Sequence, residues 1–307
     1  MPSLANERIA WFNGQFVPER QVMVPWRDRS FKYGDGAFDM TRTFDGAIFR
    51  LKEHIDRFYR SLRYLRIDPG MSPKEMIAIT EEVVSRNAHL RPENGDWWVG
   101  QRVSAGVDAV GDEGWEHTGP NVIVDCTPLP LKARARLFRD GIDVVVPSIR
   151  RVSPNSLSPR AKTHNYLNLR MANDEAKAWN KDAWSILLDE NGSLAEGIGS
   201  NIFIVRNGAL ETPRERYVLP GVSRQATMDL AAKLGIGCDE KDIDVFDAAN
   251  AEEIFLTSTS LCICPVRTFN GQVIGGNVPG PVTKRLIDAY AEMVGCDFVA
   301  QYLKHLN

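Results

Sequence analysis

Apolar and polar residues alternate in two short stretches near the start of the chain, and each stretch contains a turn dipeptide. In residues 11–17 the dipeptide is Asn13-Gly14, and in residues 37–51 it is Asp45-Gly46. Such dipeptides adopt the positive φ angles that a tight β-turn requires. Both stretches are therefore predicted to form β-hairpins.

Helical spacing of apolar residues follows the second hairpin. The apolar positions of residues 53–67 are Ile55, Phe58, Leu62 and Leu65. Their recurrence every three or four residues predicts a helix with one buried face, and Arg57 lies beside that face. A second helix is predicted to begin at Ser72-Pro73-Lys74-Glu75, where serine caps the helix and glutamate completes a capping box. Residues 97–104 and 121–126 are predicted strands.

The second half of the chain alternates between strand and helix patterns. Strands are predicted at residues 142–146, 184–189 and 201–205, and at an apolar run that ends in 255–260. The helical stripe that starts near Asn165 consists of Tyr166, Leu169, Ala172, Ala176 and Trp179. Two further helices are predicted, one from Gly221 to Leu234 and one over residues 280–294.

Composition narrows the class of protein. The 307 residues are 43% hydrophobic and 25% charged with a net charge of -3, which is ordinary for a globular protein and offers no basic surface for nucleic acid or a membrane. No apolar run reaches the roughly 20 residues that span a bilayer. The five cysteines are scattered, which fits a reducing cytoplasm, and Cys262 and Cys264 are predicted strand residues rather than metal ligands.

Two domains are expected from the order of these elements. Residues 1–127 form a small α+β domain, residues 128–135 contain two prolines and are predicted to be a linker, and residues 136–307 form a larger domain. The acidic, glycine-rich stretch 107–120 is predicted to be a loop that acts as a lid or a subunit contact.

Several polar groups stand out from this pattern. Lys162 lies on a proline-marked loop just before a predicted helix, and Glu196 precedes a strand. The helix start at Gly221 leaves backbone N–H groups pointing outward, which together with the helix dipole suit a phosphate. Residues 257–260 place four hydroxyl side chains after an apolar strand. Taken singly, these features are more typical of a surface lysine, an ordinary helix start and a polar turn than of a functional site.

Taken together, five motifs resemble the fold type IV pyridoxal phosphate (PLP) enzymes, in particular the branched-chain amino-acid aminotransferases. They are His54-x-x-Arg57, Lys162 with Asn165-Tyr166, Glu196-Gly197-x-Gly199-x-Asn201, Leu219-Pro220-Gly221-Val222-Ser223-Arg224 and Thr257-Ser258-Thr259. The likeness runs nearly from end to end. It implies a two-domain fold of α+β and α/β character, PLP as cofactor without a metal, and a homodimer with the site at its interface. Two motifs depart from the family pattern, with Val222-Ser223 in place of Ile-Thr and Ser258 in place of glycine.

The resemblance also implies a role for each cofactor residue. Lys162 forms the Schiff base with PLP and moves the proton between the substrate Cα and the cofactor. Glu196 faces the pyridine nitrogen, Tyr166 the phenolic oxygen, and Arg57 the phosphate. The full implied set is Arg57, Lys162, Tyr166, Glu196, Gly199, Ser200, Leu219, Gly221, Val222, Ser223, Ser258 and Thr259.

The substrates implied are an amino donor and a 2-oxo acid acceptor. The residues implied on the substrate side are Tyr33, Phe38, Met40, Arg42, Gly100 and Arg102. Gly100 stands where the branched-chain enzymes carry an arginine that helps bind the α-carboxylate. Either Arg42 or Arg102 is expected to bind the carboxylate instead, because Arg102 is two residues on and points to the same face of its strand.

The identity of the amino donor stays open. The motif Phe31-Lys32-Tyr33-Gly34-Asp35-Gly36 looks more like the D-amino-acid and (R)-amine transaminases. The pair Phe38-Asp39 is typical of the (R)-amine group. A PLP lyase of the aminodeoxychorismate type and a PLP-holding protein without turnover are further alternatives. The nearly end-to-end match argues against the lyase, and the presence of both Lys162 and Glu196 argues against the inactive protein.

Overall fold

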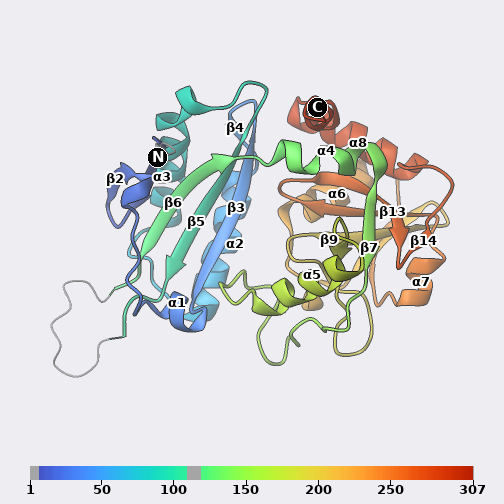
Figure 1. Ribbon diagram of the computed structural model, residues 1–307, viewed down its shortest axis with the longest axis horizontal. Coiled ribbons are helices and arrows are strands. Elements are labelled where there is room, and N and C mark those ends of the chain that lie inside the picture. Colours follow the sequence, from blue (N-terminus) through green and yellow to red (C-terminus); the bar gives the residue numbers. More distant parts are fainter. Residues whose placement is uncertain (1–6, 109–118, 307) are drawn as a thin grey trace. The chain divides into compact units, whose positions relative to one another are not determined.

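The computed structural model describes residues 7–108 and 119–306 of the chain. These residues form two compact units (Figure 1). Unit 1 runs to Leu129 and also includes the segment Ala161–Asn165, and unit 2 comprises the rest. No helix among the described residues is long and apolar enough to cross a membrane.

Unit 1 contains an antiparallel sheet with the strand order β2-β1-β6-β5-β3-β4. Its strands are β1 (Ile9–Phe12), β2 (Gln15–Pro18), β3 (Gly36–Phe44), β4 (Ala47–Ile48), β5 (Trp97–Ser104) and β6 (Val122–Pro128). Its helical segments are η1 (Glu19–Gln21), α1 (Arg29–Tyr33), α2 (Leu51–Leu65), α3 (Pro73–Arg86) and η2 (Ala88–Leu90). Both predicted hairpins are confirmed, with positive φ at Asn13-Gly14 and at Asp45-Gly46. The capping box at Ser72 and Glu75 is confirmed as well.

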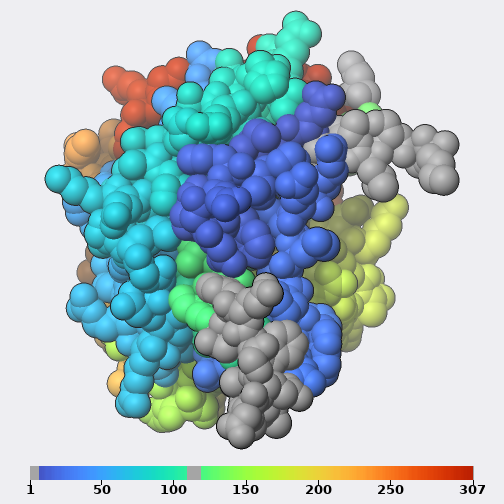
Figure 2. All heavy atoms as spheres, turned by 90° about the vertical axis from the view of Figure 1, so that its left-hand side faces the viewer, coloured from blue at the N-terminus to red at the C-terminus, as the bar shows by residue number. Residues whose placement is uncertain are grey.

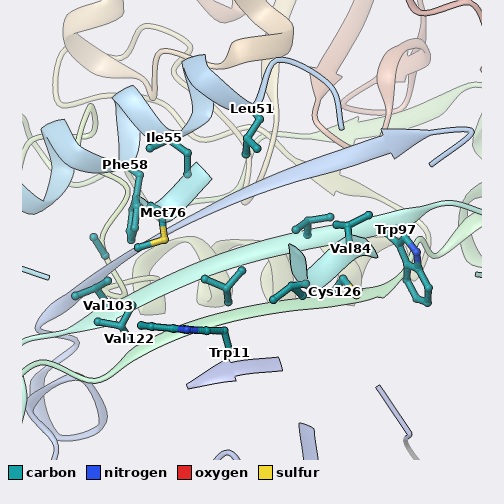
Figure 3. Close-up of a cluster of buried hydrophobic side chains, with 14 of the residues drawn as sticks. Trp11, Leu51, Ile55, Phe58, Met76, Val84, Trp97, Val103, Val122 and Cys126 are labelled. Atoms are coloured by element: carbon teal, nitrogen blue, oxygen red, sulfur yellow. The ribbon is translucent and has the colours of Figure 1, made fainter. Parts of the chain in front are cut away.

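Helices α2 and α3 cover one face of this sheet with apolar side chains (Figure 3). Ile55 and Phe58 of α2 and Met76 of α3 have no exposed surface, and they meet strand residues such as Val103. Burial of each such side chain contributes about 1.5–3 kcal/mol to folding. The helical spacing read from the sequence thus predicted the face of α2 that packs on the sheet.

Asn87 joins the end of α3 to the first strand. Its side chain accepts a hydrogen bond from the N–H of Ile9 and donates one to the C=O of Ile9, each 2.8 Å long. Figure 2 shows the N-terminal residues (dark blue) beside cyan residues of unit 1, and β1 contacts α3.

Unit 2 contains a mixed sheet with the order β11-β10-β9-β12-β13-β7-β8, and β14 pairs with β13. Its strands are β7 (Ile142–Val145), β8 (Trp184–Ser185), β9 (Asn201–Arg206), β10 (Ala209–Pro213), β11 (Cys238–Lys241), β12 (Glu253–Ser258), β13 (Cys262–Phe269) and β14 (Gln272–Val273). Its helical segments are α4 (Leu131–Asp140), α5 (Leu167–Trp179), η3 (Glu215–Tyr217), α6 (Val222–Lys233), α7 (Val245–Ala249), α8 (Pro281–Val294) and α9 (Phe298–Leu303). Cys262 and Cys264 are buried on β13, as predicted.

A buried carboxylate anchors α8 to this sheet. Glu253, at the start of β12, accepts hydrogen bonds of 2.8 Å from the N–H groups of Val282 and Thr283 in the first turn of α8. A Cβ on Gly280 would stand 2.2 Å from the Glu253 side chain, so only glycine fits at this helix start. The carboxylate also complements the helix dipole.

Three sequence predictions differ from the structure. Trp179 is 80% exposed, because α5 ends there and its buried stripe is confined to earlier residues. The strand predicted at 184–189 ends at Ser185, since the following backbone pairs with the segment that carries Glu196. The linker predicted at 128–135 is shorter, because β6 continues to Pro128 and α4 begins at Leu131 with an apolar face of its own. Most of the stretch 107–120 lies outside the described residues.

Candidate active site

Lys162 belongs by its contacts to unit 1. Its C=O accepts a hydrogen bond of 3.0 Å from the N–H of Phe38 on β3, and its N–H donates one of 3.0 Å to Ser61 Oγ on α2. The next residue, Thr163, bridges to Ala37. The residue is 8% exposed, and Nζ lies 4.6 Å from the centroid of the Phe38 ring. Backbone bonds to a strand and a helix therefore hold a buried amine in one place.

Arg57 is held by a buried network on the core side of the same sheet. Its Nε and Nη2 donate to the two carboxylate oxygens of Asp39 at 2.9 and 2.7 Å, and His54 Nδ1 lies 2.7 Å from the same carboxylate. Burial would raise the pKa of Asp39, but the charge of Arg57 and the hydrogen bonds from Arg57 and His54 hold it well below its usual value. Burial lowers the pKa of His54, which favours its neutral form. The ionised Asp39 thus orients the guanidinium of Arg57 through a two-point contact.

The opposite side of the sheet, which we call the second face, carries most of the predicted substrate residues. It consists of Phe38, Met40 and Arg42 on β3, Trp98, Gly100 and Arg102 on β5, and Asp125 on β6. Residues directly opposite one another in antiparallel strands share a face, and the pairs Phe38↔Arg102 and Met40↔Gly100↔Asp125 therefore define it. The sequence prediction that Arg102 and Gly100 point the same way holds in this register.

The two arginines of the second face differ in accessibility. Arg42 has no exposed surface, and its guanidinium contacts Asp96 at 3.5 Å and the Phe44 ring at 4.0 Å. The side chain of Arg102 is 42% exposed, and its guanidinium lies 5.2 Å from the Phe38 centroid. Of the two predicted carboxylate ligands, Arg102 is therefore the one that a solute can reach. Tyr33, at the end of α1, is 60% exposed and contacts Lys32.

A second group of predicted residues surrounds Glu196 in unit 2. Glu196 is 5% exposed, and its Oε1 accepts a hydrogen bond of 2.9 Å from Arg151 Nε. Its Oε2 accepts another, of 2.8 Å, from the N–H of Leu219. Backbone bonds in both directions between Leu187 and the segment 195–196 fix the Glu196 loop. The carboxylate is therefore buried, oriented and balanced by a cation.

The helix start at Gly221 is built around an asparagine from the Glu196 motif. Asn201 Nδ2 donates to the C=O of Leu219 at 3.0 Å, and a Cβ on Gly221 would stand 2.2 Å from Asn201 Oδ1. Among the described residues no side chain caps α6, so its first N–H groups stay available. Ser223 Oγ lies 3.3 Å from Tyr290 Oη in the first turn. This close fit explains why the motif combines an asparagine with a glycine.

The remaining cofactor residues of the prediction occupy varied surroundings in unit 2. Tyr166 lies just before α5, and Ser258 ends β12, where its Oγ accepts a hydrogen bond of 3.0 Å from the N–H of Leu261. Ser200 is buried, and its Oγ has no partner in the described part of the chain. Gly199 is exposed, with open space where a Cβ would stand. Thr259 is partly buried in the turn after β12, and Val222 begins α6.

Comparison with known proteins identifies the family. The model of amino-transferase class IV matches residues 36–269. The chain belongs to this family. It is 36% identical to a putative branched-chain-amino-acid aminotransferase of Methanocaldococcus jannaschii, over 92% of this chain and 95% of that protein. It is 32% identical to the branched-chain-amino-acid aminotransferase of Escherichia coli (strain K12), over 91% of each chain.

Solved structures give the same result. The crystal structure of the Escherichia coli branched-chain amino acid aminotransferase has a TM-score of 0.85 at 30% identity, and 94% of this chain and 95% of that chain are covered. The branched-chain amino acid aminotransferase of T.th., complexed with N-(5'-phosphopyridoxyl)-L-glutamate, has a TM-score of 0.83 at 29% identity, with 94% of both chains covered. The class IV aminotransferase fold, with its two sheets, is thereby confirmed, and the chain is a PLP-dependent aminotransferase.

The described residues fit this cofactor. A buried amine at Lys162 suits covalent attachment, the buried carboxylate of Glu196 suits a protonated ring nitrogen, and the uncapped start of α6 suits a phosphate. The buried Ser200 hydroxyl offers one more polar group that the described protein residues do not satisfy.

Sequence reasoning missed three charged residues that contact the predicted site residues. Asp39 could have been suspected, because a carboxylate in line with Ala37 and Thr41 faces the core and needs a partner. Arg151 carries no local signal, since it lies on a loop that only the tertiary fold brings to Glu196. Asp125 has none either, because its place beside Gly100 depends on the register of β5 and β6.

Proposed function

We propose that this aminotransferase transfers the amino group of a branched-chain amino acid, with L-leucine as the test substrate, to a 2-oxo acid. The observation that carries the proposal is the likeness to named branched-chain aminotransferases over more than nine-tenths of the chain. A homodimer in the cytoplasm is part of the same proposal.

Each cofactor residue has a role in this proposal. PLP, when bound, supplies a ring that accepts negative charge from the substrate Cα. Lys162 Nζ attaches the cofactor and afterwards carries the proton to and from Cα, while Ser61 and Phe38 hold its backbone still. Glu196 would face the ring nitrogen and hydrogen-bond its proton, and Arg151 orients the Glu196 carboxylate through an ion pair of 2.9 Å. In unit 1, Asp39 orients the guanidinium of Arg57, which suits a phosphate. In unit 2, the N–H groups in the first turn of α6 suit a phosphate as well.

The Glu196 role predicts a loss of rate without a loss of structure. Glu196→Gln should retain cofactor but lower kcat by about 10²-fold or more, because a neutral amide does not keep the ring nitrogen protonated. Glu190→Gln is the matched control, since Glu190 is exposed in the same unit. Single-turnover rates of both variants test the role, and an unchanged rate for Glu196→Gln contradicts it.

A half-reaction screen tests the amino donor. The PLP form is mixed separately with L-leucine, D-alanine and (R)-1-phenylethylamine, and its conversion to the pyridoxamine form is followed by absorbance. We expect the fastest conversion with L-leucine. Faster conversion with either of the other two donors overturns the branched-chain assignment.

One observation favours (R)-amines as a second candidate class. Gly100 leaves the second face without a side chain at the centre of β5, and the Arg102 side chain on the same face is 42% exposed. An amino donor without a carboxylate loses little binding energy at such a face, because it has no charge that needs an arginine. A rate with (R)-1-phenylethylamine equal to or above that with L-leucine supports this candidate.

A further inference from the structure

We propose that His164 is a positioning residue for Lys162. Its ring packs over Gly36 and holds the Phe38 ring against the lysine amine. This inference rests on the role proposed above for Lys162 and concerns how the amine is kept in place. It is carried by the pairing of residues 162–164 with the start of β3, by the space at Gly36 and by the contacts of the Phe38 ring.

The segment that carries Lys162 pairs with the first residues of β3 as a short antiparallel ladder. The N–H of His164 donates to the C=O of Gly36 at 2.8 Å. The N–H of Phe38 donates to the C=O of Lys162 at 3.0 Å, and the residues between these two pairs form an antiparallel bridge. Since β5 occupies the other edge of β3, the segment lies on the edge that β3 leaves free at its start.

This pairing sends two side chains of the segment to the side of the sheet that bears the second face. In the register of the bridge, Lys162 stands opposite Phe38, and His164 stands opposite Gly36. Residues opposite one another in antiparallel strands share a face, and residues two apart in a strand point the same way. Because Phe38 belongs to the second face, Lys162 and His164 project on that side.

Two glycines near the start of β3 make room for this segment. A Cβ on Gly36 would stand 2.5 Å from His164 Nδ1 and 2.7 Å from the C=O oxygen of Val103, so only glycine fits there. A Cβ on Gly34 would stand 3.2 Å from the Cα of Asn165. The His164 ring therefore occupies the space in which a side chain at position 36 would lie.

The Phe38 ring connects His164 to the lysine amine. Its centroid lies 5.8 Å from that of the His164 ring, with 31° between the two planes, and 4.6 Å from Lys162 Nζ. The Arg102 guanidinium contacts the same ring at 5.2 Å. Loss of the imidazole removes a packing partner of the Phe38 ring, so the ring can turn and the amine gains room to move.

The imidazole acts through its shape rather than its charge. Burial, together with the charge of Arg102, lowers the pKa of His164 to about 4, although Asp28 opposes the shift. The ring is therefore neutral at pH 7 and adds no positive charge beside Lys162 and Arg102. Its Nε2 is buried and has no hydrogen-bond partner among residues 7–108 and 119–306. A different neutral aromatic ring should therefore serve in its place.

The experiment compares His164→Ala, His164→Phe and His89→Ala, of which the last removes an exposed histidine of unit 1. In the apoenzyme, hydrogen exchange of the Phe38 and His164 amides should become about 10-fold faster in His164→Ala, because the short ladder loses packing. In the holoenzyme, the limiting rate of the half-reaction with L-leucine should fall about 10-fold, while the half-saturating concentration changes by less than about twofold. A displaced amine slows proton transfer without weakening donor binding.

The other two variants test whether the ring itself is responsible. His164→Phe should restore amide protection and half-reaction rate to within about threefold of the unmodified enzyme, and His89→Ala should change neither. An unchanged rate or unchanged protection in His164→Ala overturns the inference, and so does a His164→Phe variant as slow as His164→Ala. If L-leucine does not react with the unmodified enzyme, the proposed donor fails instead, and amide exchange in the apoenzyme still tests His164.

Discussion

Replacement of Lys162 by alanine is expected to lower kcat by about 10⁴-fold or more, since the variant loses both the covalent attachment point and the proton carrier. Lys162 is 8% exposed, and its backbone N–H and C=O are both hydrogen-bonded, so a neighbouring lysine does not replace it by a small movement. The backbone bonds to Phe38 and Ser61 do not involve the side chain, and the variant should therefore keep its fold.

Borohydride reduction measures the attachment directly. In the unmodified enzyme, reduction followed by peptide mass spectrometry should place a phosphopyridoxyl group on Lys162, and the visible absorbance of the bound cofactor should be absent from Lys162→Ala. Lys52→Ala, which removes an exposed lysine of the same unit, is the control and should behave like the unmodified enzyme. Normal turnover by Lys162→Ala would falsify the assignment.

Replacement of Asp39 by alanine is expected to destabilise unit 1 by about 3–5 kcal/mol, because it leaves the buried charge of Arg57 without its partner. Asp39 has no exposed surface, and water cannot take the place of the lost carboxylate at both guanidinium nitrogens without disturbing the packing. The effect should be local, so hydrogen exchange of the amides in α2 and β3 is the measurement. Asp56→Asn on the same helix should change stability by less than about 1 kcal/mol, as for an exposed ion pair.

The pH dependence of stability offers a second test of Asp39. Its pKa is lowered in the folded state, so the unfolded chain binds more protons as the pH falls below the ordinary value of 3.8. The stabilisation is therefore complete above that pH and is lost progressively below it. Asp39→Asn should show a shallower loss of stability in acid than the unmodified enzyme, and equal slopes would count against the buried ion pair.

Secondary structure was predictable wherever interactions between residues close in sequence decide it. The turn dipeptides, the helical stripe of α2 and the capping box at Ser72 act through neighbours in sequence, and all three appear in the structure. The predictions were wrong where contacts between residues far apart in sequence decide the local secondary structure. The backbone after Ser185 has strand-like residues, yet it pairs with the Glu196 loop instead of extending β8. Trp179 fits the helical spacing of apolar residues, but it lies at the end of α5, where the helix no longer packs against other residues, and it is exposed.

The motifs of the candidate site could also be identified from the sequence. The structure adds the residues that hold the motif side chains in position. Lys162 and Arg57 could be proposed from motifs alone. Their supports, Ser61 and Asp39, could not be identified in advance, because each lies far along the chain and reaches its partner only through the packing of α2 on the sheet.

The sequence by itself determined the family, the cofactor and the residue types that handle it, since these depend on motifs that keep their order along the chain. The tertiary structure decided which of two candidate arginines is accessible and which carboxylate stands beside Gly100. These are consequences of strand register, because a side chain's face and its cross-strand neighbours are set only when β3, β5 and β6 pair.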